Sequence, residues 1–552
     1  METVSSFRSL VPDVEVGGAT VPELVLRHAA RLGDKPALID GVTGATISYA
    51  ALADGVERVA AGLAARGFGA GDVLAICSPN LPEFALAAYG AMAAGGIVAP
   101  ANPMITADEL CGQLADSGAR MLVTVRPLLD KARAAAEKAG VDEVLVFGEG
   151  EAASADPEPG AAKDRDPGAT SFSSLMDGGH PAVAVEPVDD LGALLYSSGT
   201  TGLAKGVELT HASLVTNARQ NQAGLEVGED DVVLVALPLF HAMGLNLLLP
   251  SALAAGATAV VLPRFELNGF LAAVERHRVT VTIVVPPIML ALANHPLVDR
   301  YDHSSLRLVG CGGAPLGAEL ERRCADRLGC DVSQGFGMTE GCSTISLGPI
   351  GAPRRGSVGR LLPNVEARIV DPVTGADLGP GATGELWVRS PQLMRGYRHR
   401  PDATARTVDA SGWLHTGDLC AFDEDRYLYV VDRLKELIKY KGYQVAPAEL
   451  EHLLLGHPAV ADAAVVPRPD PESGEIPVAY VVLRTDATAE ELMAYVADRV
   501  APFKRVRAIR VTTEIPRSPA GKLLRRVLVE RERNAIDSGG RGGSHAQGAT
   551  LP

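Results

Sequence analysis

Cysteine and tryptophan are scarce in this 552-residue chain, which contains seven cysteines and two tryptophans. No two cysteines form a C-x-x-C pair, so neither a disulfide scaffold nor a structural zinc site is predicted. Charged residues make up 21% and hydrophobic residues 47% of the chain, which excludes wholesale disorder. Its 59 glycines and 37 prolines follow no triplet period, which excludes a collagen-like chain.

Basic residues are also fewer than acidic ones: the chain has 51 lysines and arginines and 67 aspartates and glutamates, so its net charge is −16. An acidic chain binds nucleic acid and anionic membranes poorly, so we expect neither as a partner. The first six residues lack the basic and apolar segments of a signal peptide, and the last four match no retention or peroxisomal signal. We therefore expect a protein of the reducing cytoplasm.

The stretch Val232–Pro263 contains no charged residue and has the length of a membrane-spanning helix. Two prolines, a histidine, an asparagine and a glycine interrupt it at short spacing. This pattern predicts two buried strands and a short helix.

Apolar runs of strand length alternate with amphipathic stretches through the first 430 residues. Val73–Cys77 reads as a strand and Leu81–Ala94 as the helix that follows it. The strand signal returns at residues 120–125, 142–147, 279–285 and 307–309. Such alternation is typical of α/β proteins with parallel sheets covered by helices.

Composition suggests the domain boundaries. Residues 148–190 are rich in Gly, Ala, Asp, Glu and Pro and are predicted to form a surface excursion between two subdomains. Residues 436–535 read as a small α+β domain, with helices at 448–455 and 489–500 and strands at 461–466 and 478–483. We expect a large domain over 1–433, a lid domain over 434–535 and a glycine-rich disordered tail over 536–552.

The most informative segment is a glycine- and hydroxyl-rich turn that follows an apolar strand. The turn comprises Ser197, Ser198, Gly199, Thr200, Thr201 and Gly202, and Lys205 comes three residues later. Glycines let backbone N–H groups turn toward an anion, and the hydroxyls and the lysine add donors. Because Lys205 lies between Ala204 and Gly206, this is not a Walker A loop. The pattern nevertheless predicts a polyphosphate cradle.

This turn resembles the phosphate loop of the adenylate-forming superfamily, which includes acyl-CoA synthetases, peptide-synthetase adenylation domains and beetle luciferase. The resemblance extends over residues 20–530, through motifs that follow in the family's order. They are Gln334–Glu340, Gly384–Arg389, Trp413–Asp418, Asp432–Glu436, Lys439–Gln444 and Arg517–Lys522. Residues 435–450 and 238–241 look most like the 4-coumarate:CoA ligase branch. The expected fold is therefore a large N-terminal α/β domain, with a small β subdomain, and a mobile α+β C-terminal domain.

The resemblance implies an acid–thiol ligase that uses ATP, Mg²⁺ and coenzyme A. A carboxylate is a poor electrophile, and joining it to AMP supplies a good leaving group. Binding must align the acid with ATP and neutralise phosphate charge. Two alternatives stay open: transfer of the adenylate to a separate carrier protein's thiol, an amine or another small nucleophile, and a catalytically silent nucleotide-binding protein.

The resemblance also assigns roles in adenylate formation. The turn 197–202 and Lys205 would grip the β- and γ-phosphates, Thr339 would contact the α-phosphate, and Glu340 would hold magnesium. The nucleoside would lie against Gln334, Gly335, Asp418 and Arg433. The catalytic lysine would be Lys522, which bridges the acid's carboxylate and the α-phosphate.

For the second half-reaction, the family rotates its C-terminal domain about a hinge that matches Lys435. This rotation would withdraw Lys522 and bring in Lys439, Lys441, Gly442 and Gln444, of which Lys441 and Gly442 would contact CoA. Arg264 aligns with a position that contacts a CoA phosphate.

The acid pocket is expected behind His241, which aligns with the family's gate to that pocket. Its walls would be Met243, Asn246, Gly310, Gly313, Cys342, Ser343 and Thr344. Plant coumarate ligases have Tyr at 243, Lys at 310 and Ala-Gly-Pro-Val at 341–344, so this pocket gains hydroxyls and loses a ring and a charge. An aromatic or arylacrylic acid is favoured, while the particular acid, the acceptor and the oligomeric state stay open.

Overall fold

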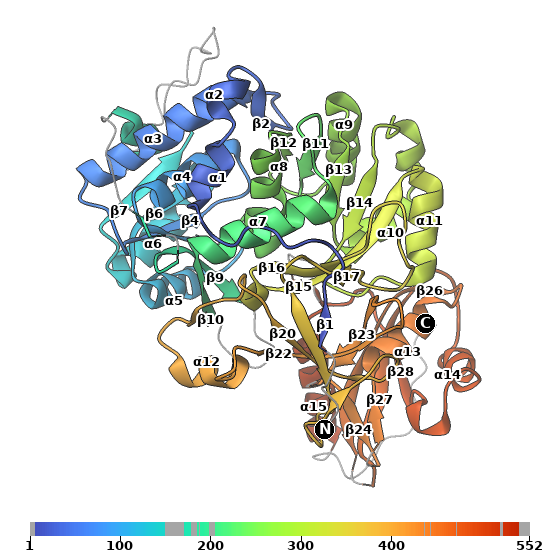
Figure 1. Ribbon diagram of the computed structural model, residues 1–552. Helices are drawn as coiled ribbons and strands as arrows, with labels where there is room; N and C mark the ends of the chain where they lie inside the picture. Colours follow the sequence, from blue (N-terminus) through green and yellow to red (C-terminus); the bar gives the residue numbers. More distant parts are fainter. Residues whose placement is uncertain are drawn as a thin grey trace. The chain divides into compact units, whose positions relative to one another are not determined.

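The computed structural model describes residues 6–148, 170–177, 185–186, 188–197, 205–434, 436–441, 443–470, 472–518, 521 and 523–539 (Figure 1). The chain divides into two compact units. The first comprises residues 1–368, 387–416 and 422–429, and the second comprises 369–386, 417–421 and 430–552.

An eight-stranded sheet forms the N-terminal part of the first unit, in the order β21-β10-β9-β5-β4-β6-β7-β8. Strand β4 is parallel to both of its neighbours. Its register with β5 is kept from Val73 to Cys77, whereas its register with β6 shifts between Val73 and Leu74. The strands are β4 Val73–Cys77, β5 Ile97–Ala101, β6 Ala119–Val125, β7 Glu143–Phe147, β8 Thr170–Ser171, β9 Leu191–Ser197, β10 Lys205–Thr210 and β21 Gly396–Tyr397. The strand predicted at residues 73–77 is confirmed.

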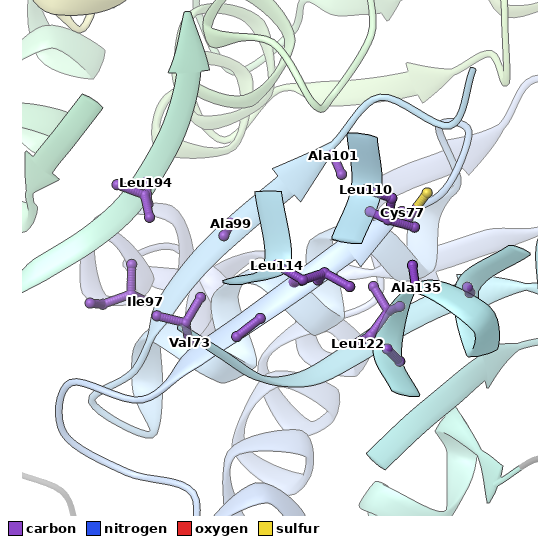
Figure 2. Close-up of a cluster of buried hydrophobic side chains, with 14 of the residues drawn as sticks. Val73, Cys77, Ile97, Ala99, Ala101, Leu110, Leu114, Leu122, Ala135 and Leu194 are labelled. Atoms are coloured by element: carbon purple, nitrogen blue, oxygen red, sulfur yellow. The ribbon is translucent and has the colours of Figure 1, made fainter. Parts of the chain in front are cut away.

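Helices α5 (Ala107–Ser117) and α6 (Leu129–Ala139) pack on this sheet. Figure 2 shows the resulting core, in which Leu110 and Leu114 of α5 meet Leu122 of β6. Small residues such as Ala99 and Ala135 let the helices approach the strands closely. Strands buried on both faces give the continuous apolar runs seen in the sequence.

A nine-stranded sheet follows, in the order β17-β16-β15-β14-β13-β11-β12-β2-β3. Six neighbouring strands from β15 to β2 are parallel, and β16 returns antiparallel to β15. The strands are β2 Pro36–Asp40, β3 Thr46–Ser48, β11 Val232–Val235, β12 Thr258–Val261, β13 Val281–Val284, β14 Leu308–Cys311, β15 Asp331–Met338, β16 Ser343–Leu347 and β17 Arg360–Leu361.

The remaining helices of the first unit alternate with these strands or join them (Figure 1). They are α1 Val21–Leu26, α2 Ala29–Leu32, α3 Tyr49–Ala65, α4 Pro82–Ala93, α7 His211–Leu225, α8 Leu249–Ala255, α9 Leu267–His277, α10 Pro286–Asn294, α11 Ala318–Leu328 and α12 Pro401–Thr407.

The uncharged stretch at 232–263 folds as predicted, with β11 and β12 at its two ends. Between them lie a π-helical segment, Met243–Leu248, and helix α8. In the part of the chain that the structure describes, no helix is long and apolar enough to cross a bilayer.

A six-stranded sheet in the order β1-β18-β20-β22-β23, with β19 beside β18, contributes residues to both units. Its strands are β1 Phe7–Arg8, β18 Glu366–Val370, β19 Asp377–Leu378, β20 Gly384–Arg389, β22 Leu414–Phe422 and β23 Leu428–Arg433.

The second unit contains a five-stranded sheet in the order β25-β24-β27-β26, with β28 parallel to β27. Its strands are β24 Ile438–Tyr440, β25 Tyr443–Val445, β26 Val460–Asp470, β27 Gly474–Leu483 and β28 Ala508–Val511. Its helices are α13 Pro447–Leu455, α14 Ala489–Ala497 and α15 Arg525–Gly539.

Alternation along β26 gives this sheet two apolar faces. Val465 packs in one cluster with Leu450 of α13 and Leu492 of α14. Its neighbour Val466 packs in the other cluster with Leu528 of α15. Helix α15 continues to Gly539, beyond residue 535, where we expected the ordered domain to end.

Candidate active site

The turn predicted to bind phosphate lies in the sequence between β9 and β10. These strands are antiparallel, and Ser197 and Lys205 are paired across them. Because β9 is parallel to β5, the turn follows the carboxyl end of a strand in a largely parallel sheet, which is where α/β folds bind ligands. The predicted residues Ser198, Gly199, Thr200, Thr201 and Gly202 lie outside the described residues.

Lys205 places its ammonium group over an aromatic ring. Its Nζ lies 4.5 Å from the centroid of Tyr397 on the neighbouring strand β21. Within the described ranges, no carboxylate forms an ion pair with Lys205. Its positive charge therefore suits an anionic ligand such as a phosphate.

Thr339 and Glu340 begin a short 3₁₀ turn, Thr339–Gly341, at the carboxyl end of β15. Glu340 is buried, and its Oε1 accepts a 2.7 Å hydrogen bond from the Tyr397 hydroxyl. Its other carboxylate oxygen accepts no hydrogen bond from the described residues. Lys205 and Glu340 thus contact the same tyrosine.

Magnesium fits this donor set. The described residues contain no group of three or more His, Cys, Asp or Glu side chains able to hold a metal. Mg²⁺ commonly binds one or two carboxylates together with substrate phosphates and water. Glu340, beside a lysine that suits a phosphate, meets that requirement.

Gln334 on β15 is buried, and both ends of its amide are engaged. Oε1 accepts a 3.0 Å bond from the Leu316 N–H, and Nε2 donates a 2.7 Å bond to Glu321. Burial raises the pKa of Glu321, which also accepts the Gly356 N–H. These bonds let Gln334 fix the backbone around it. The adjacent Gly335, which was also predicted to lie against the nucleoside, has no side chain, so its backbone can present a flat surface to a base.

Asp418 on β22 and Arg433 on β23 lie together in the second unit. The Arg433 Nε donates a 2.9 Å hydrogen bond to Asp418 Oδ1, and Asp418 is buried. A carboxylate held in this way can accept the two hydroxyls of a ribose.

The other predicted residues of the second unit cluster in sequence around β24 and β25. Lys439 and Gln444 are paired across these strands, and Lys441 is exposed, with a φ of +47°. Lys435, Gly442 and Lys522 lie outside the described residues. Arg264 is an exposed residue after β12 in the first unit.

The predicted acid pocket draws on the π-helical segment and on β16. Asn246 is buried and donates to the Cys342 carbonyl oxygen at 3.4 Å. The Met243 sulfur lies 3.4 Å from where a Cβ on Gly312 would stand, which brings it close to the loop of Gly310 and Gly313. Thr344 lies on β16, and His241 lies two residues before the π-helical segment.

Two features of this wall stand out. Cys342 has a φ of +69°, which is strained for a residue with a side chain. The Ser343 hydroxyl is 5% exposed and has no hydrogen-bond partner among the described residues. A buried hydroxyl of this kind is satisfied when a ligand supplies a polar group.

Sequence reasoning missed the amides that hold this wall. Asn217 Nδ2 donates to the Thr344 carbonyl oxygen at 3.0 Å, and its Oδ1 accepts from Asn246. Gln392 Nε2 donates to the carbonyl oxygens of Gly341 and Thr344. The sequence held one sign of these contacts, three amide residues close together on α7 at positions 217, 220 and 221. All three are buried, and buried amide side chains usually have hydrogen-bond partners.

Comparison with known protein families gives two matches along the chain. Residues 25–398 match the family model for the AMP-binding enzyme, and residues 449–522 match that for the AMP-binding enzyme C-terminal domain. The chain belongs to the AMP-binding enzyme family. The resemblance inferred from the motifs is confirmed, as is the α/β architecture with a large N-terminal and a small C-terminal domain.

Similar proteins span nearly the whole chain. 4-Coumarate–CoA ligase 2 of Oryza sativa subsp. japonica is 42% identical, over 96% of this chain and 95% of its own. The crystal structure of ATP-bound MatB from Rhodopseudomonas palustris is 29% identical, with a TM-score of 0.83, over 94% of this chain and 100% of its own. Amide bond synthetase McbA from Marinactinospora thermotolerans is 29% identical, with a TM-score of 0.81, over 93% and 99%.

Proposed function

We propose that this protein is an ATP-dependent ligase that converts a carboxylic acid to an acyl-adenylate and then to an acyl-CoA, releasing pyrophosphate and AMP. The observation that carries the proposal is that Lys205 and Glu340 contact one tyrosine beside the carboxyl ends of two sheets. A cation close to a magnesium-compatible carboxylate supports the proposal that a nucleotide triphosphate binds here. The similarity to a 4-coumarate–CoA ligase supports CoA as the acceptor.

In the first step, a carboxylate oxygen of the acid attacks the α-phosphorus, and the bond from that phosphorus to pyrophosphate breaks. Lys205 and the turn 197–202 neutralise charge on the departing pyrophosphate, and Thr339 contacts the α-phosphate. Lys522 holds the acid's carboxylate beside the α-phosphate. Glu340 would hold Mg²⁺, which would supply screening of the phosphate charges.

In the second step, the CoA thiol loses its proton to solvent, and its sulfur attacks the carbonyl carbon of the adenylate. The bond from that carbon to AMP breaks. Rotation about a hinge at Lys435 exchanges Lys522 for Lys439, Lys441, Gly442 and Gln444, and Arg264 contacts a CoA phosphate. Asp418 and Arg433 hold the ribose throughout.

The proposed substrate is an aromatic or arylacrylic acid that carries a hydrogen-bonding substituent. It would enter past His241 and lie against Met243, Asn246 and Gly310. The unpartnered hydroxyl of Ser343 supports this choice, because a purely aliphatic acid would leave that buried group unsatisfied.

The cytoplasm is the proposed location, because the seven cysteines are all free, which suits a reducing compartment.

The test is a pyrophosphate-release screen with the full-length protein, ATP and Mg²⁺, across benzoates, cinnamates, aminated aryl acids and medium-chain fatty acids. We expect release with hydroxylated aryl or arylacrylic acids and conversion to a thioester when CoA is added. ATP binding without pyrophosphate release from any acid would favour a silent nucleotide-binding protein. An adenylate that persists after CoA is added would point to a carrier thiol, an amine or another small nucleophile.

A further inference from the structure

Tyr397 is a buried residue that the motifs of the sequence did not single out. It ends β21, which pairs with β10 so that Tyr397 lies opposite Val207, two residues from Lys205. Its backbone N–H donates to the Thr404 hydroxyl at 2.9 Å, and its side chain is 7% exposed. Backbone pairing and burial therefore hold this side chain in one place.

The hydroxyl and the ring of Tyr397 each contact a charged side chain that we propose binds the nucleotide or its magnesium ion. The hydroxyl donates to Glu340 Oε1 at 2.7 Å, and the face of the ring lies 4.5 Å from Lys205 Nζ. The same segment also binds the backbone of Glu340, because the Met394 N–H donates to its carbonyl oxygen at 2.9 Å. One short strand thus fixes a lysine and a glutamate that lie far apart in the sequence.

The direction of the hydrogen bond is set by the environment. An ionised carboxylate only accepts hydrogen bonds, so the Tyr397 hydroxyl donates and the Glu340 Oε1 atom accepts. A hydrogen bond to a carboxylate is stronger than one to a neutral acceptor. The bond occupies one carboxylate oxygen and leaves the other for a metal ion.

We propose that Tyr397 is a positioning residue that orients the Glu340 carboxylate for Mg²⁺ and steadies Lys205 for the β- and γ-phosphates. The inference rests on the proposed function, since it concerns the ATP that the ligase would use. Its two contacts are separable: the hydroxyl acts on Glu340 and magnesium, and the ring acts on Lys205 and phosphate.

The decisive variant is Tyr397→Phe in the full-length protein, which keeps the ring and removes the hydroxyl. We expect a fall of about 10- to 100-fold in the rate of adenylate formation, the range that follows from losing a hydrogen bond to a charged group. The concentration of Mg²⁺ needed for half-maximal activation should rise. Thiolysis of supplied adenylate should change by less than about twofold, because that step does not use the triphosphate.

A binding measurement tests the same inference without turnover. Calorimetry would compare the affinity of the protein for a non-hydrolysable ATP analogue with and without Mg²⁺. In the wild-type protein Mg²⁺ should tighten binding, and Tyr397→Phe should lose most of that gain. Tyr397→Leu, which also removes the ring, should weaken binding of the analogue even without Mg²⁺.

The chain offers a matched control in Tyr480→Phe. Tyr480 is also 7% exposed, and its hydroxyl donates to Glu532 at 2.8 Å in the second unit. The two variants lose the same kind of bond, so their melting temperatures should fall by similar amounts. Only Tyr397→Phe should change the dependence on Mg²⁺.

The inference would be overturned if Tyr397→Phe and Tyr480→Phe had the same Mg²⁺ dependence as the wild-type protein. Equal loss of both half-reactions in Tyr397→Phe would also contradict it, because that result signals a general defect of folding. A wild-type protein that binds the analogue with an Mg²⁺-dependent gain but turns over no acid would refute the proposed ligase and leave this inference standing.

Discussion

Two segments carry the lysines proposed for adenylate formation, and they are held in different ways. In the first unit, the β9–β10 hairpin is fixed by backbone pairing to β5 on one side and β21 on the other. In the second unit, the residues before and after Lys522 make a few backbone contacts, such as that of the Leu524 N–H with the Pro516 carbonyl oxygen, and arginine side chains tie them to the sheet.

The arginines bracket the proposed catalytic turn. Arg517 donates to Asp462 on β26 at 2.8 Å and to the Gly521 carbonyl oxygen at 3.3 Å. At the other end, Arg525 donates to Glu436 at 2.6 Å, pairs with Glu451 and reaches the Val465 carbonyl oxygen. Both ends are therefore tied to the sheet of the second unit.

The two segments should therefore respond differently to the loss of a single side chain. Backbone pairing within a sheet is shared among many bonds, so loss of one side chain changes it little. The arginine clusters depend on a few planar groups with fixed fork geometry. We therefore expect adenylate formation to be more sensitive to single substitutions in the arginine clusters than to single substitutions in the hairpin.

The largest expected effect separates the two half-reactions. Lys522→Ala should lower adenylate formation by about 100-fold or more, because it removes a charge that stabilises the transition state. The same variant should still convert supplied adenylate and CoA to the thioester. Lys441→Glu should show the reverse pattern. Rapid-quench assays of each half-reaction would measure both, and equal loss of both steps in both variants would contradict domain alternation.

An intermediate effect is expected at the arginine cluster. Arg525→Lys keeps the charge but loses the fork that joins Glu436, Glu451 and Val465, so we expect adenylate formation to fall about tenfold. The neighbouring Arg526, whose side chain is 72% exposed, supplies the control Arg526→Lys. If both variants formed adenylate at the wild-type rate, the arginine cluster would have no part in placing Lys522.

The third effect, the smallest at neutral pH because it appears only in acid, concerns the hairpin. His211 follows β10, is buried, and accepts the Val21 N–H at Nδ1. Burial lowers its pKa to about 4. The unfolded chain binds this proton below about pH 6.5, so native stability falls as pH drops from about 6.5 to 4, by at most about 3 kcal/mol.

Urea unfolding across that pH range would measure this loss. His211→Gln should flatten the pH dependence, whereas the same change at the exposed His452 should leave it intact. A wild-type slope that persisted in His211→Gln would show that other groups destabilise the hairpin in acid.

Local patterns predicted the elements of the fold well. The strand at 73–77 ends at the predicted residues because apolar β-branched and aliphatic residues run between turn signals. The helix predicted over 489–500 ends earlier, at Ala497, where the chain turns through Asp498. Family motifs assigned both Asp418 and Arg433 to the nucleoside, and in the structure the two side chains are hydrogen-bonded to each other.

Local sequence patterns could not predict contacts between residues that lie far apart in the sequence. Tyr397 joins Lys205 and Glu340 from a two-residue strand, too short to carry a periodic signal. The motif assigned Gln334 to the nucleotide, yet its amide is engaged by Leu316 and Glu321. Which polar groups meet across a sheet depends on tertiary packing, so the sequence alone could name the motifs but not their partners.

The proposed ligase activates its acid through an acyl-adenylate. The direct measurement uses an acid whose carboxylate oxygens are isotopically heavy, incubated with the protein, ATP, Mg²⁺ and CoA, with mass spectrometry of the products. Because a carboxylate oxygen bonds to the α-phosphorus and stays there when the thioester forms, we predict one heavy oxygen in AMP and none in pyrophosphate. Thioester formation with the heavy oxygen in inorganic phosphate, or with unlabelled AMP, would contradict the account.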